Sequence, residues 1–232
     1  MTRIIITQPR FLPVRSYVER MYLSDVFVYL DDALHNKRSN EHRNKIKTAS
    51  GAKMLSVPVD HTTVKPLCKT LISNNPPDWK KKHLKTIEYN YRRSPAFSDI
   101  FPFVEKLYSG EYVYLDEICY ASENWFIEYL GIECKFLNSG SMNISGTNQI
   151  KILNICKKLN ADTYISGPLG RNYIDIDLFK SNGIKVLFHN FVEKEYKQLY
   201  GDFIPNLSVI DLLFNYGKDS MKYIRCGSLS EK

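Results

Sequence analysis

Two short apolar runs joined by one helical segment open the chain, and their order limits the fold more than any other feature. Residues 3–6 (RIII) predict a strand, and residues 14–24 repeat apolar side chains at helical spacing. Residues 26–30 (VFVYL) are apolar at every position, which is typical of a strand that a parallel sheet buries on both faces. A strand, a helix and a second strand in this order predict a parallel, right-handed crossover.

Polar loops follow both of these strands. The segment TQPRFLP (residues 7–13) follows the first strand, and Asp31 and Asp32 follow the second. In open α/β sheets ligands bind at the carboxyl ends of the strands, so the two loops are expected to face one crevice. Gln8, Asp31 and Asp32 are therefore candidate catalytic residues.

A basic stretch continues from Asp32 to residue 48. Its Lys and Arg side chains can donate charge-assisted hydrogen bonds to phosphate or carboxylate groups, and Arg can do so through two N–H groups at once. These candidate donors are Lys37, Arg38, Arg43, Lys45 and Lys47. A solvated surface loop would have the same composition, and composition alone favours neither interpretation.

The middle of the chain predicts two more short strands and a series of helices. Residues 54–59 and 67–72 look like strands that could pair with each other, although Pro58 and Pro66 restrict parts of them to a sheet edge. Helices are predicted over residues 76–93, 99–108 and 114–129, and a strand over residues 133–137.

The polar segment SGSMNISGTNQ (residues 139–149) divides the chain into predicted parts of residues 1–138 and 139–232. The same segment could instead be a ligand loop, and one single domain over residues 1–232 is the alternative. In the second part, helices and strands alternate over residues 148–159, 163–166, 176–182 and 185–189, and a helix follows over residues 207–214. The sequence therefore predicts an α/β fold with a mainly parallel sheet, Rossmann-like βαβ units and two closely packed halves.

Composition limits the partners and the compartment. With 232 residues, 44% of them hydrophobic, the chain can bury a full core, and its net charge of +7 favours an anionic partner such as a nucleotide, a nucleic acid or a membrane surface. The five cysteines are scattered and odd in number, which indicates reduced thiols in a cytoplasmic protein. We expect no signal peptide and no transmembrane helix, because no apolar run is long enough for either.

The common catalytic motifs are absent from the sequence. It contains no Walker motif, GxSxG elbow, HExxH motif or GxGxxG loop, so phosphate-loop kinases, serine hydrolases, zincins and ordinary Rossmann dehydrogenases lose their main support. The loop SGPLGR (residues 166–171) could present backbone N–H groups and Arg171 to an anion. A plain turn between a strand and a helix is the simpler interpretation.

Three histidines and one aspartate each allow two interpretations. His83 could act as a base near neutral pH, or it could be packed and hydrogen-bonded on an apolar helix face. His35 and His42 could join the two aspartates around a divalent ion, but their spacing matches no metal signature and we predict no metal site. Asp211 is the single charge in an apolar helix, and we expect it to anchor internal hydrogen bonds.

Four segments of the sequence resemble the WbqC-like family, which occurs in bacteria and is often linked to surface-polysaccharide gene clusters. They are residues 7–32, 36–48, 79–91 and 196–217. The family opens with a motif of the form HQPxYLPW, which is matched by Gln8, Pro9, Leu12 and Pro13. Its histidine, a common asparagine and its tryptophan are replaced here by Thr7, Arg10 and Val14.

Other positions keep the family pattern and are the ones to which a family role can be transferred. They are Asp31, Asp32, Lys37, Arg38, Arg43, Asn44, Lys47, Trp79, His83, Tyr91, Asp211 and Asn215. With the residues above, the resemblance implies two groups of candidate site residues. The catalytic candidates are Gln8, Asp31, Asp32 and His83. The candidates for binding substrate or phosphate are Lys37, Arg38, Arg43, Asn44, Lys47, Tyr91 and Arg171.

The family context implies an enzyme of surface-polysaccharide (lipopolysaccharide, O-antigen) biosynthesis. A transferase that moves an acyl or aminoacyl group to a nucleotide-linked amino sugar would suit it. Arg38, Arg43 and Lys47 would hold a diphosphate or carboxylate, and Asp31 or His83 would take the amine proton. The expected partners are a nucleotide-linked sugar or another phosphorylated small molecule and an acyl donor, and the cofactor is open.

Two other classes of protein remain as alternatives. A non-catalytic nucleic-acid or nucleotide-binding module would use the basic stretch, the lysines at positions 80–85 and stacking tyrosines. A scaffold within an assembly complex is the other alternative. The discrete small-molecule site is favoured over nucleic acid.

Overall fold

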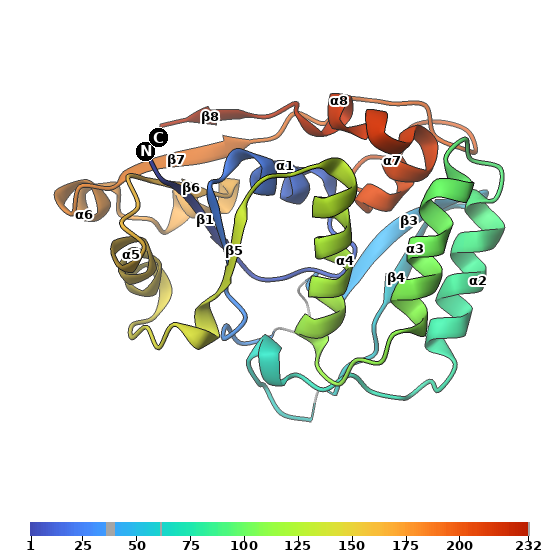
Figure 1. Ribbon diagram of the computed structural model, residues 1–232, viewed down its shortest axis with the longest axis horizontal. Coiled ribbons are helices and arrows are strands. Elements are labelled where there is room, and N and C mark those ends of the chain that lie inside the picture. Colours follow the sequence, from blue (N-terminus) through green and yellow to red (C-terminus); the bar gives the residue numbers. More distant parts are fainter. Residues whose placement is uncertain (36–39, 61, 232) are drawn as a thin grey trace.

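The computed structural model describes residues 1–35, 40–60 and 62–231. The described residues form a mixed α/β fold around a six-stranded sheet with the strand order β5-β2-β1-β6-β7-β8 (Figure 1). The strands are β1 (Arg3–Thr7), β2 (Val26–Tyr29), β5 (Lys135–Asn138), β6 (Thr163–Ser166), β7 (Lys185–Asn190) and β8 (Ser228–Ser230). All neighbours pair in parallel except β7 and β8, which pair antiparallel. The prediction of an α/β fold with a mainly parallel sheet is therefore confirmed.

Helices cover both faces of this sheet. On one face, Ile5 of β1 and Phe27 of β2 pack in one core with α1 (Arg15–Leu23) and α4 (Leu115–Leu130). On the other face, Ile4 of β1 and Val28 of β2 pack in a second core with α5 (Asn148–Lys158) and α6 (Ile176–Ser181). Successive strand residues point to opposite faces, which explains why the two N-terminal strands are apolar at every position.

The strand order changes direction at β1. On one side, β1 pairs with β2, to which the chain leads directly through α1. On its other side, β1 pairs with β6, which begins about 130 residues after the end of β2. Strands from both predicted parts, residues 1–138 and 139–232, therefore lie in one sheet. A gap outside the carboxyl ends of the strands is expected where neighbouring connections diverge in this way.

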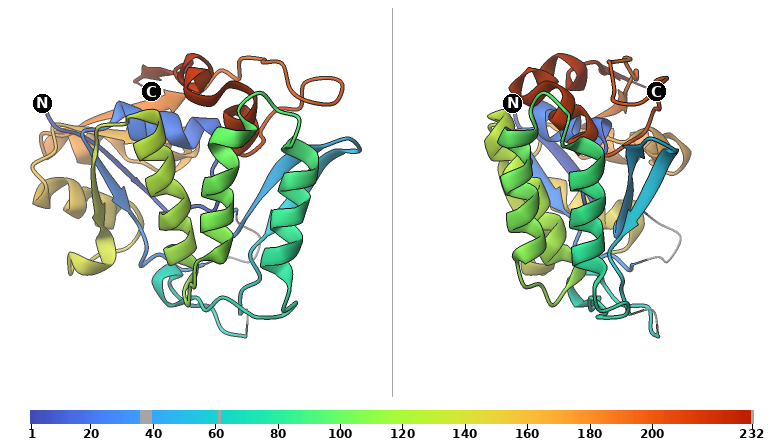
Figure 2. Two further views of the ribbon diagram at one scale, coloured as in Figure 1. Left: turned by 45° about the vertical axis from the view of Figure 1, so that its right-hand side comes forward. Right: turned by 90° about the vertical axis from the view of Figure 1, so that its right-hand side faces the viewer.

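The remaining elements form a layer beside the sheet. Helices α2 (Trp79–Tyr91), α3 (Phe97–Ser109) and α4 stand side by side, and a two-stranded hairpin of β3 (Arg43–Thr48) and β4 (Gly51–Ser56) lies behind α2 (Figure 2). Helices α7 (Val209–Tyr216) and α8 (Met221–Ile224) close the top of this layer in Figure 1. Among the helices of the described ranges, none has the length and apolar character needed to cross a membrane.

The structure corrects the prediction for residues 43–72. The second half of the basic stretch is not a loop but strand β3. Residues 54–56 of the predicted strand 54–59 belong to β4, which pairs with β3 rather than with residues 67–72. The start of that segment forms a short 3-10 helix (Leu67–Lys69). An isolated bridge between Val59 and Ile72, flanked by backbone hydrogen bonds from Asp60 to Leu71 and from Ser73 to Pro58, joins the two segments that were expected to pair. Burial of Ile46 against the second layer explains why a charged segment becomes a strand.

Candidate functional site

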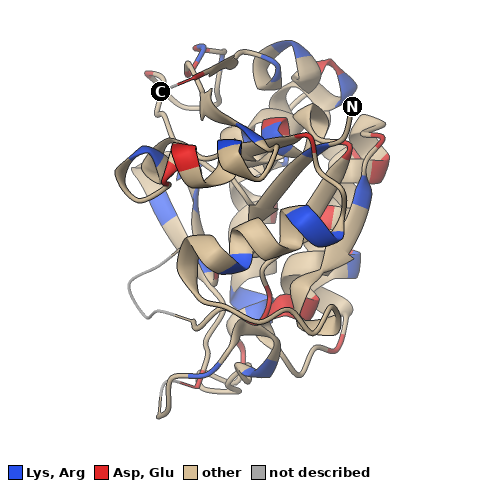
Figure 3. Cartoon of the chain, turned by 90° about the vertical axis from the view of Figure 1, so that its left-hand side faces the viewer, with Lys and Arg blue, Asp and Glu red and all other residues tan. Residues whose placement is uncertain are grey.

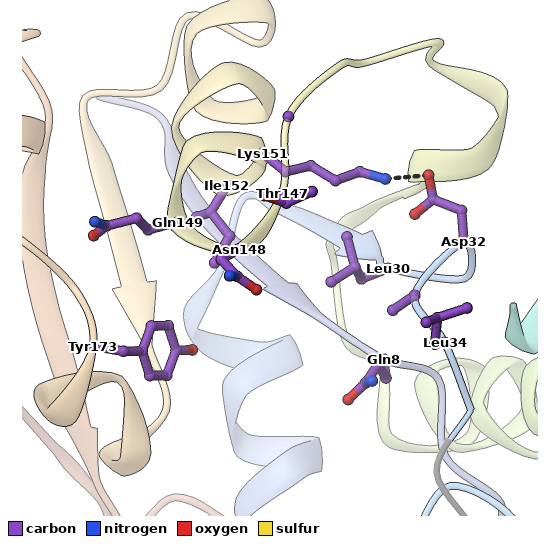
Figure 4. A pocket seen from close by; sticks show the side chains of 12 residues that line it. Gln8, Leu30, Asp32, Leu34, Thr147, Asn148, Gln149, Lys151, Ile152 and Tyr173 are labelled. Atoms are coloured by element: carbon purple, nitrogen blue, oxygen red, sulfur yellow. Dashed lines mark hydrogen bonds and ion pairs between the residues drawn. The ribbon is translucent and has the colours of Figure 1, made fainter. Parts of the chain in front are cut away.

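A cavity of about 860 Å³ lies at the carboxyl ends of β1, β2 and β6. Its lining residues come from the loops after these strands and from the first turn of α5. They are Gln8, Leu30, Asp32, Ala33, Leu34, Gly146, Thr147, Asn148, Gln149, Lys151, Ile152 and Tyr173. Figure 4 shows Asn148, Tyr173 and Gln8 around one open space, with Lys151 extending from α5 toward Asp32 at the upper right. The loops after β1 and β2 thus face one cavity, as the strand order predicts.

The wall opposite these loops is the amino-terminal turn of α5. Thr147 is its N-cap residue, and the Thr147 side chain forms no capping hydrogen bond. The first backbone N–H groups of the helix carry the partial positive charge of the helix dipole, and they lie on the cavity wall because Asn148 and Gln149 both line it. The turn can therefore accept an anionic group of a ligand.

Asp31 and Asp32 have different environments. Asp31 is buried, and its Oδ1 accepts hydrogen bonds from the Gly140 N–H at 2.8 Å and the Ser139 hydroxyl at 3.2 Å. Asp32 lines the cavity, where its Oδ1 accepts a 2.5 Å hydrogen bond from Ser139 and its Oδ2 forms an ion pair with Lys151. Asp31 therefore ties the β2 loop to residues 139–140, and Asp32 is the carboxylate that a ligand in the cavity can reach.

The loop after β1 is held in place by groups from distant parts of the chain. Glu123 accepts the Arg10 N–H at 2.5 Å, and the Phe11 N–H donates to the carbonyl of Glu41 at 2.8 Å. Asn44 donates to the carbonyl of Leu12 at 2.5 Å, and Leu12 itself has a φ of 45°, which only a firmly held non-glycine residue adopts. These bonds fix the backbone that presents Gln8 to the cavity.

Tyr173 closes the β6 side of the cavity. Its pKa is raised by burial, and the charge of Arg20 counteracts that rise. Gly170, in the turn after β6, packs so closely on Ser166 that a Cβ at this position would overlap the serine hydroxyl. The glycine therefore allows the turn that carries the chain to Tyr173.

Lys47 and Tyr91 lie in a buried network in the second layer. Tyr91 donates to Asp211 at 2.6 Å, and Tyr196 donates to the other oxygen of Asp211 at 2.7 Å. The Lys47 Nζ donates to Gln198 at 3.0 Å and to backbone carbonyls of residues 201 and 202. None of these side chains lines the cavity. Asp211 thus accepts hydrogen bonds from two tyrosines, and Tyr91 in turn accepts the main-chain N–H of the buried Lys47.

Two further candidates also lie outside the cavity lining. His83 is packed edge-on to Trp79 and Tyr108, and burial followed by the charge of Lys53 lowers its pKa to about 4. Arg171 donates to Asn190 and Ser230 and stacks over Phe188. The structure therefore places Gln8 and Asp32 in the cavity with Asp31 behind them, and it places His83 and Arg171 elsewhere.

Residues 36–39, which include Lys37 and Arg38, lie outside the described residues. Arg43 is the first residue of β3, in register with Ser56. Within the described ranges, no cluster of three or more His, Cys, Asp or Glu side chains has a geometry suited to a metal ion.

Several cavity residues are not among the candidates from the sequence. Thr147, Asn148 and Lys151 are about 140 positions from Gln8 and Tyr173 is 165 positions from it, and their proximity depends on β6 pairing with β1. The available signal was the polar segment at residues 139–149, which was considered as a ligand loop. Within this segment, residues 146–149 line the cavity.

Comparison of the sequence with known proteins identifies its family. Residues 8–223 match the WbqC-like protein family. The chain belongs to this family. It is also 32% identical over 232 residues to an uncharacterised protein of Mycobacterium tuberculosis, Rv1507c, with 97% of this chain and 98% of the relative covered. No solved structure matches the chain.

Proposed function

We propose that this WbqC-like protein is a transferase that moves an activated acyl or aminoacyl group to the amine of a nucleotide-linked amino sugar in surface-polysaccharide biosynthesis. The observation that carries the proposal is the cavity at the carboxyl ends of β1, β2 and β6, where Asp32, Gln8 and the uncapped first turn of α5 come together. Its volume of about 860 Å³ is in the range of small-molecule sites.

Each wall of the cavity has a role in this reaction. The α5 turn binds an anionic group, and Gln8 and Asn148 supply amide donors and acceptors to sugar hydroxyls. Asp32 takes a proton from the sugar ammonium, and the free amine then attacks the acyl carbonyl carbon. A C–N bond forms while the bond from this carbon to the leaving group breaks. The leaving group departs with the electron pair, and the nitrogen releases its second proton to that leaving group or to water. Lys151 beside Asp32 keeps that carboxylate oriented.

The alternative of an extended nucleic-acid surface fits the face of α5 and α6 less well. On this face Lys and Arg segments are interspersed with Asp and Glu segments (Figure 3). A polyanion would favour a continuous positive surface, whereas a cavity with a few polar groups suits a small ligand.

The experiment measures binding and then transfer. Thermal shift is recorded with nucleoside-diphosphate amino sugars that carry a free amine, the matching sugars with a hydroxyl in its place, acyl-coenzyme A compounds and single-stranded DNA. An amino-sugar nucleotide should raise the melting temperature at a salt concentration where DNA has no effect. Mass spectrometry of the sugar after incubation with candidate acyl donors then detects the amide product.

Asp32→Asn separates binding from chemistry. We expect it to bind the amino-sugar nucleotide but to transfer roughly 100-fold more slowly or worse, because a general base is removed. Asp78→Asn is the matched control, since Asp78 is also paired with a lysine but lies at the start of α2. The proposal is refuted if no amino-sugar nucleotide binds, or if Asp32→Asn and Asp78→Asn transfer at the wild-type rate.

A further inference from the structure

Two arginines meet at one buried tyrosine beside the cavity. The guanidinium carbon of Arg10, in the loop after β1, lies 5.9 Å from the centroid of the Tyr17 ring. That of Arg20, on α1, lies 5.2 Å from the same centroid. Tyr17 is fully buried and its hydroxyl donates to the carbonyl of Gln8, so the pair is anchored to a residue that lines the cavity.

Neither guanidinium has a counterion among the residues that the structure describes. No carboxylate of these residues lies within 4.0 Å of Arg10 or Arg20, and neither side chain donates a hydrogen bond. The Nε of Arg10 is buried without a partner. Burial lowers the pKa of Arg20, and the charge of Arg10 lowers it further. Two cations held close together and partly out of water are unfavourable until an anion joins them.

Arg15 shows what a structural arginine looks like on the same helix. It also lies over aromatic rings, those of Phe191, Tyr196 and Phe203. However, its guanidinium forms a 2.5 Å ion pair with Glu193 and donates to the carbonyl of Lys194 at 2.8 Å. Stacking on aromatic rings therefore does not explain why Arg10 and Arg20 lack such partners.

The buried acid on α4 does not neutralise the pair. Glu123 is fully buried, and its oxygens are occupied by the Arg10 main-chain N–H and the Tyr17 hydroxyl rather than by a guanidinium. Burial raises its pKa to about 8, so this carboxyl is largely protonated at neutral pH. Both arginines thus keep an uncompensated positive charge.

The position of the pair points to a ligand that enters from the cavities. A Cβ on Gly167, the first residue after β6, would come within 3.2 Å of the Arg20 Nη1, so the guanidinium lies against the β6 loop. Arg20 is also close enough to Tyr173 to counteract the rise in its pKa. Arg10 lines a second cavity of about 280 Å³ together with Asn44 and Lys45. Arg10 therefore lies at the smaller cavity, and Arg20 lies at the loop after β6, beside the larger cavity.

We propose that Arg10 and Arg20 form a diphosphate-binding subsite, in which each guanidinium binds one phosphoryl group of a nucleoside-diphosphate-linked ligand. This deepens the proposed function and rests on it for the identity of the rest of the ligand. Guanidinium groups suit this task because they donate paired N–H groups to phosphate oxygens and do not lose their charge. Gly167 lets the Arg20 guanidinium lie close to the β6 loop, because a Cβ at this position would come within 3.2 Å of its Nη1.

The test uses inorganic pyrophosphate as the probe, with inorganic phosphate as the comparison. Calorimetric titration should show pyrophosphate binding to the wild type at least roughly tenfold more tightly than phosphate, because only pyrophosphate reaches both guanidinium groups. Arg10→Gln and Arg20→Gln should each weaken pyrophosphate binding by roughly tenfold or more. Arg92→Gln is the matched control, because Arg92 also stacks on a tyrosine, Tyr89, at 5.5 Å but lies on the exposed end of α2.

Melting temperatures without ligand separate a binding role from a structural one. Removing one of two unpaired like charges should leave the melting temperature of the ligand-free protein unchanged or raise it. A clear decrease in both Arg10→Gln and Arg20→Gln would assign the arginines to the fold and overturn the proposal. Equal pyrophosphate affinity in the wild type, both variants and the control would overturn it too, since binding would then be an adventitious ion only.

This subsite and the transferase can fail independently. If pyrophosphate binds through the two arginines but no amino-sugar nucleotide binds or reacts, the subsite stands and the transferase assignment fails. If an amino-sugar nucleotide binds and reacts equally well in Arg10→Gln, Arg20→Gln and wild type, the transferase stands and the subsite is wrong.

Discussion

Replacing Glu123 with Gln should make the protein less sensitive to alkaline pH. Glu123 is fully buried on α4, and the hydrogen bonds that it accepts from the Arg10 N–H and the Tyr17 hydroxyl only partly offset the effect of burial on its pKa. Its pKa rises from 4.5 to about 8. A glutamine keeps the shape and the acceptor for the Arg10 N–H, and its amide can donate to the tyrosine oxygens.

The sign and size of the effect follow from proton linkage. Between pH 4.5 and 8 the folded state holds a proton on Glu123 that the unfolded state has released, so stability is full below this interval and falls as the pH rises through it. Each pH unit within the interval costs up to about 1.4 kcal/mol. From pH 5.5 to 8.5 the wild type should lose on the order of 3 kcal/mol that Glu123→Gln does not lose.

Urea unfolding of both proteins at a series of pH values measures this difference. Other titrating groups are common to both proteins and cancel in the comparison. Parallel curves for the two proteins over this range would refute the reasoning, because they would mean that Glu123 titrates with the same pKa in the folded and unfolded states. A wild type that becomes relatively more stable with rising pH would show instead that Arg10 holds Glu123 ionised.

Three further predictions test other parts of the structure. Gly170→Ala should destabilise the protein by roughly 1–3 kcal/mol because its Cβ would overlap the hydroxyl of Ser166, and adding Ser166→Ala should restore part of that loss in a double-mutant cycle measured by urea unfolding. Asp211→Ala should cost roughly 3 kcal/mol or more by the same measurement, because two buried tyrosine hydroxyls lose their acceptor, whereas Asp211→Asn should cost less. His83→Gln should leave ligand binding unchanged in the thermal-shift assay. Since the folded pKa of His83, about 4, is below its ordinary value of 6.5, the wild type should lose more stability than this variant as the pH falls from 6.5 to 4.

The sequence predicts the first strand, helix and strand well because each has a local signal. Their apolar residues are nearly continuous in the strands and helically spaced between them, and the structure places β1, α1 and β2 within one or two residues of the predicted bounds. The direction of both strands then suffices to bring Gln8 and Asp32 to one edge. This half of the cavity follows from local pattern and the handedness of the crossover.

The other half depends on contacts that no local pattern contains. The sequence around Thr163 does not indicate that β6 pairs with β1. This pairing nevertheless brings Asn148 and Tyr173 opposite Gln8. Strand β3 could not be predicted from its sequence for a related reason. Lys47 suggests a solvated loop, but its ammonium group is buried and bonded to a side chain and carbonyls about 150 residues away.

Net charge is a weak guide to the site, because several of the positive charges near the sheet already have partners. Arg3 pairs with Asp25, Arg15 with Glu193, and Lys151 with Asp32. Lys47, a candidate by sequence, is bonded to oxygens in the second layer. Arg10 and Arg20 differ from these residues because no carboxylate among the described residues pairs with their guanidinium groups. A fold that holds two such cations against one ring, at the gap between β1 and β6, is most stable when an anion is bound between them. This links the strand order to ligand binding: the pairing of β6 with β1 that opens the gap also brings Gly167 against Arg20.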